Sequence, residues 1–279
     1  STLTTRPLGP RGRVAFVYPG AFNAYLDLGR DLFHLFPFLY ESFGHVVSDI
    51  GRSVRDRALY PRSLTPLTKK ERRAREAALL ADPPALIESG TSSAVLFTTI
   101  LREGFGVHPH TALGYSLGEV SMLWALGVWQ DGDRGLRAWR SSPLFKSQLS
   151  GPKTLIRERW DRPDDVDDED LWATYVLKAP VARVRSAVAG RPRVEITLVN
   201  TPGEVVIGGD PGSCREVIEA LDVHALPVPY DAVIHASLMF SLRPDFAALY
   251  DYPVRAVPET TFYSAADYGT LTLESGALA

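Results

Sequence analysis

The sequence has very little cysteine: Cys214 is the only one among 279 residues. A single cysteine cannot form a disulfide within the chain, and no metal-ligand spacing surrounds it. We therefore expect neither a disulfide framework nor a metal site. A reducing, cytoplasmic setting fits this composition best.

Long apolar runs and clustered positive charge are also missing. No uninterrupted apolar stretch approaches the ~20 residues of a membrane-spanning helix, and residues 1–13 contain no signal-peptide core. The chain has 30 basic and 33 acidic residues, a formal net charge of −3, and no basic block interleaved with aromatics. We therefore expect a soluble protein that binds neither membrane nor nucleic acid. Residue 1 is serine rather than methionine, so we also expect a piece of a longer polypeptide.

What the sequence does have is a glycine-flanked serine motif, Gly114-Tyr115-Ser116-Leu117-Gly118. It follows an extended-looking stretch and precedes a helix-like one. This GxSxG pattern is typical of a nucleophile elbow, in which a strand turns sharply into a helix and exposes the serine hydroxyl. The amide of the next residue then points at an anion site at the helix N-terminus. A plain strand-to-helix turn is the alternative interpretation.

Helix-like and strand-like stretches alternate along the first half, which favours an α/β protein. The patterns predict strands over 14–18 and 107–113, helices over 26–35, 69–80 and 89–102, and an irregular stretch over 48–68. The helix over 69–80 carries a basic cluster, Lys69, Lys70, Arg72, Arg73 and Arg75. Such a cluster either meets a phosphate-bearing ligand or forms a solvated face, and the second is commoner.

The second half shows a different pattern after an acidic, proline-containing connector over 157–170. Strands are predicted over 173–178, 194–199, 204–208 and 225–228, with helices over 180–189 and 213–221. The order βαββαβ is the split βαβ arrangement of a ferredoxin-like domain. We therefore predict a large α/β domain from residues 12–170 and 231–279, with a small domain inserted at 171–230.

A serine nucleophile needs a base, and the chain offers six histidines. Five of them fit structural or surface positions better: His34, His45, His108, His110 and His224. His235 differs, because it follows the last predicted strand of the small domain, where the chain returns to the large one. That position makes His235 the candidate base.

Three ordered motifs together resemble the malonyl-CoA:acyl-carrier-protein acyltransferase family. The opening Phe16-Val17-Tyr18-Pro19-Gly20 is similar to FxFPGQG, the elbow GYSLGE to GHSxGE, and His235-Ala236-Ser237-Leu238-Met239 to HxxLM. The resemblance runs from about residue 14 to the C-terminus and includes Asn200-Thr201-Pro202-Gly203. Shorter segments of the sequence, including Ser141 to Phe145 and Gly151-Pro152, look like those in the acyltransferase domains of polyunsaturated fatty acid synthases and enediyne polyketide synthases.

The resemblance implies an α/β-hydrolase-like large subdomain with an inserted ferredoxin-like subdomain, and a two-step acyl transfer without a permanently bound cofactor. Ser116 and His235 would form the catalytic dyad, with malonyl-CoA as donor and an acyl carrier protein as acceptor. The backbone amides of Leu117 and Ala21 would hold the oxyanion. Neighbouring domains of a multidomain synthase are the expected partners.

A substrate with a free carboxylate calls for an arginine, whose planar fork matches it. The family places this arginine about 25 residues after the serine, where this chain has Ser141. Arg140 is one residue short, which a one-residue deletion in the preceding turn would explain. Arg137, nearly one helical turn earlier, is the alternative.

The pocket residues that the resemblance implies depart from the usual family pattern at several positions. Tyr115 replaces a histidine of the elbow, Ala21 replaces a glutamine, and Ser92 stands where a glutamine helps to line the site. Ile234 is bulky at the position just before the histidine, where a small residue would admit a methyl branch, and Leu117 stands where a glutamine accompanies branched substrates. Malonyl is therefore preferred over methylmalonyl. Asn200 matches a family asparagine near the histidine, and a structural role fits it equally well.

Two rival functions stay open from the sequence. A serine esterase or thioesterase would need an acidic triad member between serine and histidine, and the main acidic concentration there is the connector. An inactive docking domain is the other. The family also continues beyond the point matching Ala279, so we expect a truncated chain or a missing complementary chain.

Overall fold

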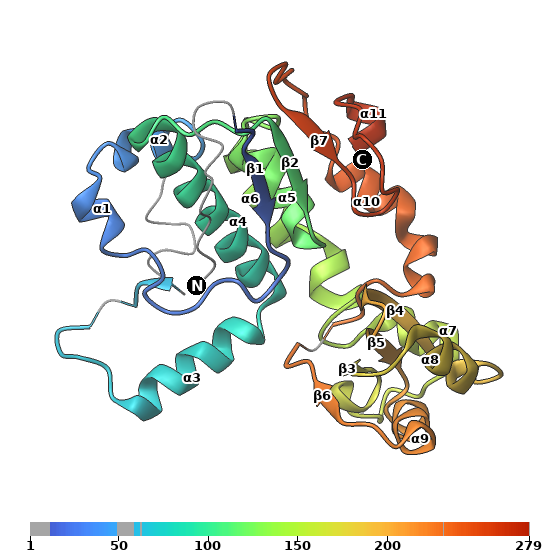
Figure 1. The fold of residues 1–279 in the computed structure, drawn as a ribbon. Coiled ribbons are helices and arrows are strands. Elements are labelled where there is room, and N and C mark those ends of the chain that lie inside the picture. The colour runs from blue at the N-terminus through green and yellow to red at the C-terminus, as the bar shows by residue number, and fades with distance from the viewer. Residues whose placement is uncertain (1–11, 49–58, 62, 231, 279) are drawn as a thin grey trace, which may run out of the picture. The chain divides into compact units, whose positions relative to one another are not determined.

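The structure, a computed structural model, describes residues 12–48, 59–61, 63–230 and 232–278. The chain divides into two compact units. One comprises Ser1–Arg137 with Tyr250–Ala279, and the other comprises Ala138–Leu249. Figure 1 identifies the helices and strands of each unit.

The first unit is built on a small parallel sheet. Its strands are β1 (Ala15–Tyr18), β2 (Thr111–Gly114) and β7 (Thr261–Tyr263), in the order β1-β2-β7. Residue 15 pairs with 111, and 111 pairs with 261, so the strands begin at one level of the sheet. Parallel strands need long crossover connections, and helices supply them here.

Helices α4 (Pro83–Thr99) and α5 (Leu117–Ala125) are the central ones of this unit. Asp82 caps α4 by accepting from the amide of Ala85, and proline occupies the first helical position. Most of α4 is buried, including Glu88 and several small polar residues. Thr91 Oγ1 lies 3.3 Å from Ser121 Oγ of α5, so small side chains let the two helices approach closely.

The other elements of this unit are all shorter than α4. They are α1 (Leu32–Leu35), α2 (Leu39–Gly44), α3 (Lys69–Leu80), the π-turn η3 (Ile100–Gly104) and α11 (Ser275–Leu278), while α6 (Gly132–Ser141) runs across the division. The helix predicted over 26–35 is wrong in its first half, because Asp27 and Gly29 adopt positive φ and form turns. The strand predicted over 107–113 contains only its last three residues, followed by Gly114.

Helix α3 has the predicted bounds, and a capping box explains why it begins where it does. Thr68 accepts from the amide of Glu71, whose carboxylate accepts from the amide of Thr68. Of the basic cluster, Arg72 forms an ion pair with Asp27 at 2.6 Å. The cluster residues are exposed, which fits the solvated face. Of the stretch 48–68, residues 49–58 and 62 lie outside the described residues.

The second unit contains a four-stranded antiparallel sheet with the predicted ferredoxin-like topology. Its elements are β3 (Ala173–Leu177), α8 (Val181–Val188), β4 (Val194–Thr201), β5 (Glu204–Gly209), α9 (Pro211–Leu221) and β6 (Ala225–Pro227). The spatial order β4-β5-β3-β6 places the first and third strands of this motif at the centre. One face packs on α8 and α9 through a core that includes Val205, Ile207 and Val217. Cys214 belongs to this core, and burial raises the pKa of its thiol to about 12.

A second apolar cluster enlarges this unit beyond the sheet and its two helices. It joins the segment 144–172 to 233–249 through Leu144, Ile156, Trp172 and Val233. The elements here are η4 (Leu144–Gln148), α7 (Thr154–Trp160), η5 (Asp168–Asp170), η6 (Ser237–Leu242) and α10 (Arg243–Leu249). The domain boundaries given above, 171–230 against 12–170 with 231–279, stay a prediction, because compact packing and fold topology divide a chain by different criteria.

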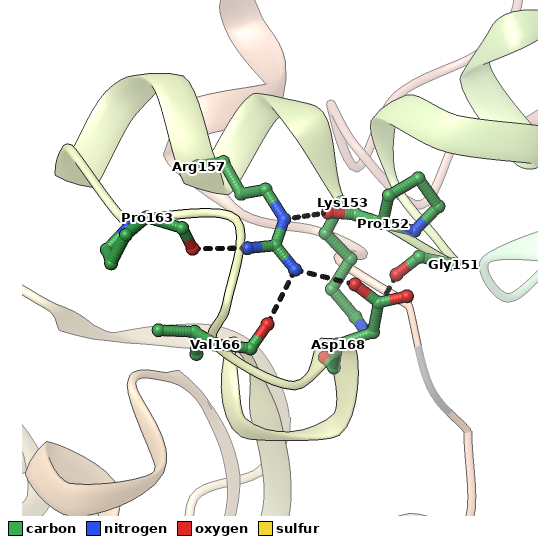
Figure 2. A network of polar contacts seen from close by, with 7 residues as sticks. All are labelled: Gly151, Pro152, Lys153, Arg157, Pro163, Val166 and Asp168. Carbon is green, nitrogen blue, oxygen red and sulfur yellow. Dashed lines mark hydrogen bonds and ion pairs between the residues drawn. The ribbon is translucent and has the colours of Figure 1, made fainter.

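The acidic connector is folded onto α7 by one arginine. The guanidinium of Arg157 donates to the carbonyl oxygens of Pro152, Pro163 and Val166 and to the carboxylate of Asp168, at 2.6 to 2.9 Å. Lys153 is fully buried beside it, and its Nζ donates to the carbonyl oxygen of Asp168 at 2.6 Å. Figure 2 shows the Arg157 guanidinium at the centre of these hydrogen bonds. The connector is therefore an ordered part of the second unit.

Candidate active site

Ser116 has an unusual backbone conformation at the junction of β2 and α5. Its φ is 55° and its ψ −121°, and it occupies the N-cap position of α5. A residue with a side chain reaches this region only when the surrounding structure holds it there, at a cost of about 1–3 kcal/mol. This is the sharp strand-to-helix turn that a nucleophile elbow requires.

The two glycines of the motif are required by close backbone contacts. A Cβ on Gly114 would lie 2.1 Å from the carbonyl carbon of Gly118, and a Cβ on Gly118 would lie 2.2 Å from the carbonyl oxygen of Tyr18. No side chain fits at either distance. The elbow interpretation of GxSxG therefore has a direct steric basis in this chain.

The two predicted oxyanion donors lie in the same unit as Ser116. Leu117 is the first residue of α5, so its amide is outside the hydrogen-bond ladder of that helix. Ala21 follows Gly20, and a Cβ on Gly20 would lie 2.9 Å from Cδ1 of Tyr115. The backbone before Ala21 therefore packs directly against the elbow.

Tyr115 and Ser92 occupy different surroundings near this turn. The amide of Tyr115 donates to the carbonyl oxygen of Tyr18 at 3.0 Å, which extends the β1–β2 pairing, while its side chain is 42% exposed. Ser92 is half-buried on α4. Gly90 of the same helix approaches the elbow, since a Cβ there would lie 3.1 Å from Cδ2 of Leu117.

His235 belongs to the second unit, in the loop that precedes η6. Val233 is fully buried and Ala236 nearly so, while the side chain of His235 reaches solvent. Its φ is 54°, so it too has a left-handed conformation. Desolvation by the surrounding protein lowers the pKa of His235 from its usual 6.5. The imidazole is therefore biased toward the neutral form that a general base needs.

The remaining predicted site residues lie in the His235 loop, on α6 and on β4. Ile234 is half-buried and immediately precedes His235. Arg137 and Arg140 both lie on α6, where Arg137 is exposed and Arg140 half-buried. Asn200 is exposed at the end of β4, and its Nδ2 donates to Oε1 of Glu204 on β5 at 3.0 Å. That bond fits the structural alternative for Asn200.

Sequence reasoning missed Glu195, which lies on β4. Its Oε1 accepts from the amide of Ser237 at 2.9 Å and from the Ser237 hydroxyl at 3.1 Å. Ser237 is two residues after His235. The two partners are 42 positions apart, so no local pattern could have paired them.

The described part of the chain shows neither a cluster of metal ligands nor a membrane span. In 12–48, 59–61, 63–230 and 232–278 there is no group of three or more histidine, cysteine, aspartate or glutamate side chains placed to hold a metal. Within the same ranges, no helix has both the length and the apolar character needed to cross a membrane.

Comparison with known proteins bears on the family resemblance. The chain matches no model of a known protein family. It is 26% identical over 253 residues to a polyunsaturated fatty acid synthase of Thraustochytrium sp., a match that covers 89% of this chain and 12% of that protein. The highly reducing polyketide synthase easB of Emericella nidulans is 25% identical over 233 residues, with 81% of this chain and 8% of that protein covered. The chain thus spans a small part of the curated relatives it matches.

Solved structures decide the fold. The acyltransferase domain from the second module of the salinomycin polyketide synthase superposes with a TM-score of 0.69 at 21% identity, over 96% of this chain and 56% of that one. The chain has the acyltransferase fold. The complex of a type II polyketide synthase acyl-carrier protein with its malonyl-transacylase also gives 0.69 at 21% identity, over 95% of this chain and 77% of that one.

The acyltransferase fold confirms two predictions made from the motifs. The resemblance to malonyl-CoA:acyl-carrier-protein acyltransferases is confirmed, since relatives and structural neighbours are synthases and acyltransferases. The fold class is confirmed as well, an α/β-hydrolase-like large subdomain with a small ferredoxin-like one.

Proposed function

We propose that this chain is the malonyl-loading acyltransferase of a multidomain fatty acid or polyketide synthase. The observation that carries the proposal is the strained conformation of Ser116 at the N-terminus of α5. Membership of the enediyne type stays a prediction. Malonyl-CoA is the substrate, and no bound cofactor takes part.

Ser116 and His235 are the reacting dyad in this proposal. His235 accepts the proton of the Ser116 hydroxyl while Oγ attacks the thioester carbonyl carbon of malonyl-CoA. The C–S bond breaks, CoA leaves with the proton returned by His235, and a malonyl ester remains on Ser116. The lowered pKa of His235 suits it to accept that proton near neutral pH.

The second half of the cycle reverses these steps with a different thiol. His235 deprotonates the phosphopantetheine thiol of an acyl carrier protein, and the sulfur attacks the malonyl ester. Ser116 Oγ then leaves and takes the proton from His235. This ping-pong scheme uses one base in both directions and needs no third acidic residue.

Negative charge develops on the carbonyl oxygen in both steps. The amides of Leu117 and Ala21 stabilise it in this proposal, and one such donor is typically worth about 3 kcal/mol of the barrier. Arg140 binds the free carboxylate of the malonyl group as a planar fork. Tyr115, Ser92 and Asn200 complete the proposed pocket.

Substrate selection follows from the room beside the α-carbon of the acyl group. Ile234 is bulky just before the base, and Leu117 follows the nucleophile where a glutamine would accompany branched substrates, so an unbranched malonyl group is favoured over methylmalonyl. One methyl clash discriminates by about 1–3 kcal/mol. We expect Ser116 to be acylated faster by malonyl-CoA than by methylmalonyl-CoA, and faster methylmalonyl loading would contradict this assignment.

The experiment that tests the proposal is intact-mass analysis of the full-length protein after mixing with malonyl-CoA. A malonyl adduct of about 86 Da that is absent from Ser116→Ala identifies nucleophile and substrate together. Transfer of the group to a carrier protein, lost in His235→Ala, supports the acyltransferase. Net hydrolysis would indicate an esterase, and no reaction would indicate a docking domain.

A further inference from the structure

The loop that carries His235 is fastened on its N-terminal side by the segment before α7. The amide of Val233 donates to the carbonyl oxygen of Leu149 at 2.8 Å, and Ala232 forms an antiparallel bridge with Ser150. Val233 also lies in the apolar cluster with Leu149. Residues 232 and 233 are therefore fixed by both backbone pairing and burial.

On the C-terminal side, the loop is fastened by Glu195. One carboxylate oxygen accepts from both the amide and the hydroxyl of Ser237, the first residue of η6. Because Val194 lies in the core under α8 and α9, strand alternation directs Glu195 to the opposite face of the sheet. Its cross-strand partner is Gly208, and a Cβ there would lie 2.6 Å from the Trp172 ring. Glu195 thus reaches Ser237 from the sheet face that Trp172 covers.

His235 lies between Val233 and Ser237, the two residues held by these hydrogen bonds, and its φ is 54°. A residue other than glycine keeps such a conformation only when its neighbours over-determine it. The amide of Ser237 is two residues away, so removing its acceptor would free one end of a three-residue span. His235 could then relax toward an ordinary φ and carry its imidazole away from its working position.

We propose that Glu195 is a positioning residue for His235: through Ser237, it holds the base in the orientation that acyl transfer needs. Glu195 contacts neither substrate nor reacting atoms in this assignment, which rests on the proposed function of His235. A carboxylate is suited to the task, because hydrogen bonds to a charged acceptor are about twice as strong as neutral ones.

The test compares Glu195→Ala with Glu195→Gln and with Glu219→Ala in the full-length protein. Glu219 is an exposed glutamate on α9 of the same unit, which makes it the matched control. We expect Glu195→Ala to lower the rate of Ser116 acylation by malonyl-CoA about 10- to 100-fold, the usual loss for a displaced catalytic group. Glu195→Gln keeps an oxygen acceptor and is expected to lose about threefold or less. Binding of malonyl-CoA, measured with Ser116→Ala as background, should be unchanged in all of them.

A double-mutant cycle separates positioning from a general loss of structure. If Glu195 acts through His235, adding Glu195→Ala to His235→Ala lowers the residual rate no further. If the double variant loses the product of the two single fold-losses in acylation rate, the proposal is wrong. It is also wrong if Glu195→Ala acylates Ser116 as fast as Glu219→Ala does. If Glu195→Ala does not fold, Glu195→Asp serves instead, because it keeps the charge but falls one methylene short of Ser237.

The same experiment distinguishes this inference from the function on which it rests. Should Ser116→Ala or His235→Ala still form the malonyl adduct and pass it on, the dyad itself is wrong. Should both abolish transfer while Glu195→Ala behaves like the control, only the positioning role is wrong.

Discussion

Gly118 and Tyr18 are so close that a Cβ on Gly118 would lie 2.2 Å from the carbonyl oxygen of Tyr18. The first turn of α5 therefore rests directly on the end of β1. The same carbonyl oxygen accepts from the amide of Tyr115 at 3.0 Å. Because both partners are backbone, neither can move aside without disturbing the strand that precedes Ser116.

Replacing Gly118 by alanine tests this contact. The added methyl meets backbone, so we expect a loss of about 3 kcal/mol or more in the free energy of unfolding, together with loss of Ser116 acylation. Denaturant unfolding and intact-mass analysis measure the two effects. Gly44→Ala is the matched control, since a Cβ there meets nothing within 4 Å. An equally stable, fully active Gly118→Ala would contradict the steric account of the elbow.

Arg157 offers a stability prediction in the second unit. Its side chain is 12% exposed and its guanidinium bonds three carbonyl oxygens and Asp168. Arg157→Ala leaves those acceptors without their donor, and because the Asp168 side chain is 43% exposed, we expect a loss of about 1–3 kcal/mol in the free energy of unfolding. Lysine has no planar fork, so Arg157→Lys is expected to recover little.

Amide hydrogen exchange over residues 151–170 provides the readout for Arg157. Faster exchange there in Arg157→Ala, with little change in the sheet β1-β2-β7, is the expected result. The exposed Arg159 of the same helix supplies the control, Arg159→Ala. Equal exchange in the two variants would mean that the connector is held by other contacts.

The lowered pKa of His235 leads to a prediction for pH dependence. The neutral imidazole is the active base, so the acylation rate rises with pH through the pKa of His235. Because desolvation lowers that pKa from 6.5, the acidic limb of the profile should have its midpoint below 6.5. A stopped-flow or quench measurement of Ser116 acylation between about pH 5 and 8, where histidine titrates, provides the profile. A midpoint above 6.5 would contradict the lowered pKa, and a rate that does not fall on the acidic side would contradict the assignment of His235 as the base.

The lowered pKa of His235 also makes the free energy of unfolding depend on pH. The pKa of His235 is lower in the folded protein than in the unfolded chain. At pH values between these two pKa values, the unfolded chain therefore binds more protons than the folded protein. The contribution of His235 to stability is therefore complete above about pH 6.5 and is lost as pH falls through the folded pKa. His235→Ala should remove this part of the pH dependence.

Local signals explain which elements the sequence predicts well. Helix α3 begins at Lys69 because Thr68 and Glu71 form a capping box, a pattern visible in four residues. Helix α9 begins two residues earlier than predicted, at Pro211, because Asp210 caps it. The helix predicted over 26–35 is shorter because its apolar spacing does not reveal the positive φ of Asp27. Pattern and cap together fix an element, and pattern alone does not.

The candidate site also contains one part that local sequence predicts and one part that it does not. Ser116 is found from five adjacent letters, because its strained turn needs glycine at two fixed positions. The support of His235 is not found, because only the fold brings Leu149 to Val233 and Glu195 to Ser237. Long-range contacts of this kind leave no periodic or local trace in one sequence.

Arg140, rather than Arg137, is expected to be the carboxylate clamp. A bidentate, charge-assisted pair is worth about 1.5–3 kcal/mol, so Arg140→Ala should lower kcat/KM for malonyl-CoA by about 10- to 100-fold. Acetyl-CoA has no carboxylate, so its slower reaction should be unaffected by the same change. Arg140→Lys keeps the charge without the fork and should recover only part of the loss. The measurement is the ratio of the two substrates' kcat/KM in each variant, because a general loss of activity leaves that ratio constant. A selective loss of malonyl activity in Arg137→Ala, with Arg140→Ala unchanged, would move the clamp one helical turn earlier on α6.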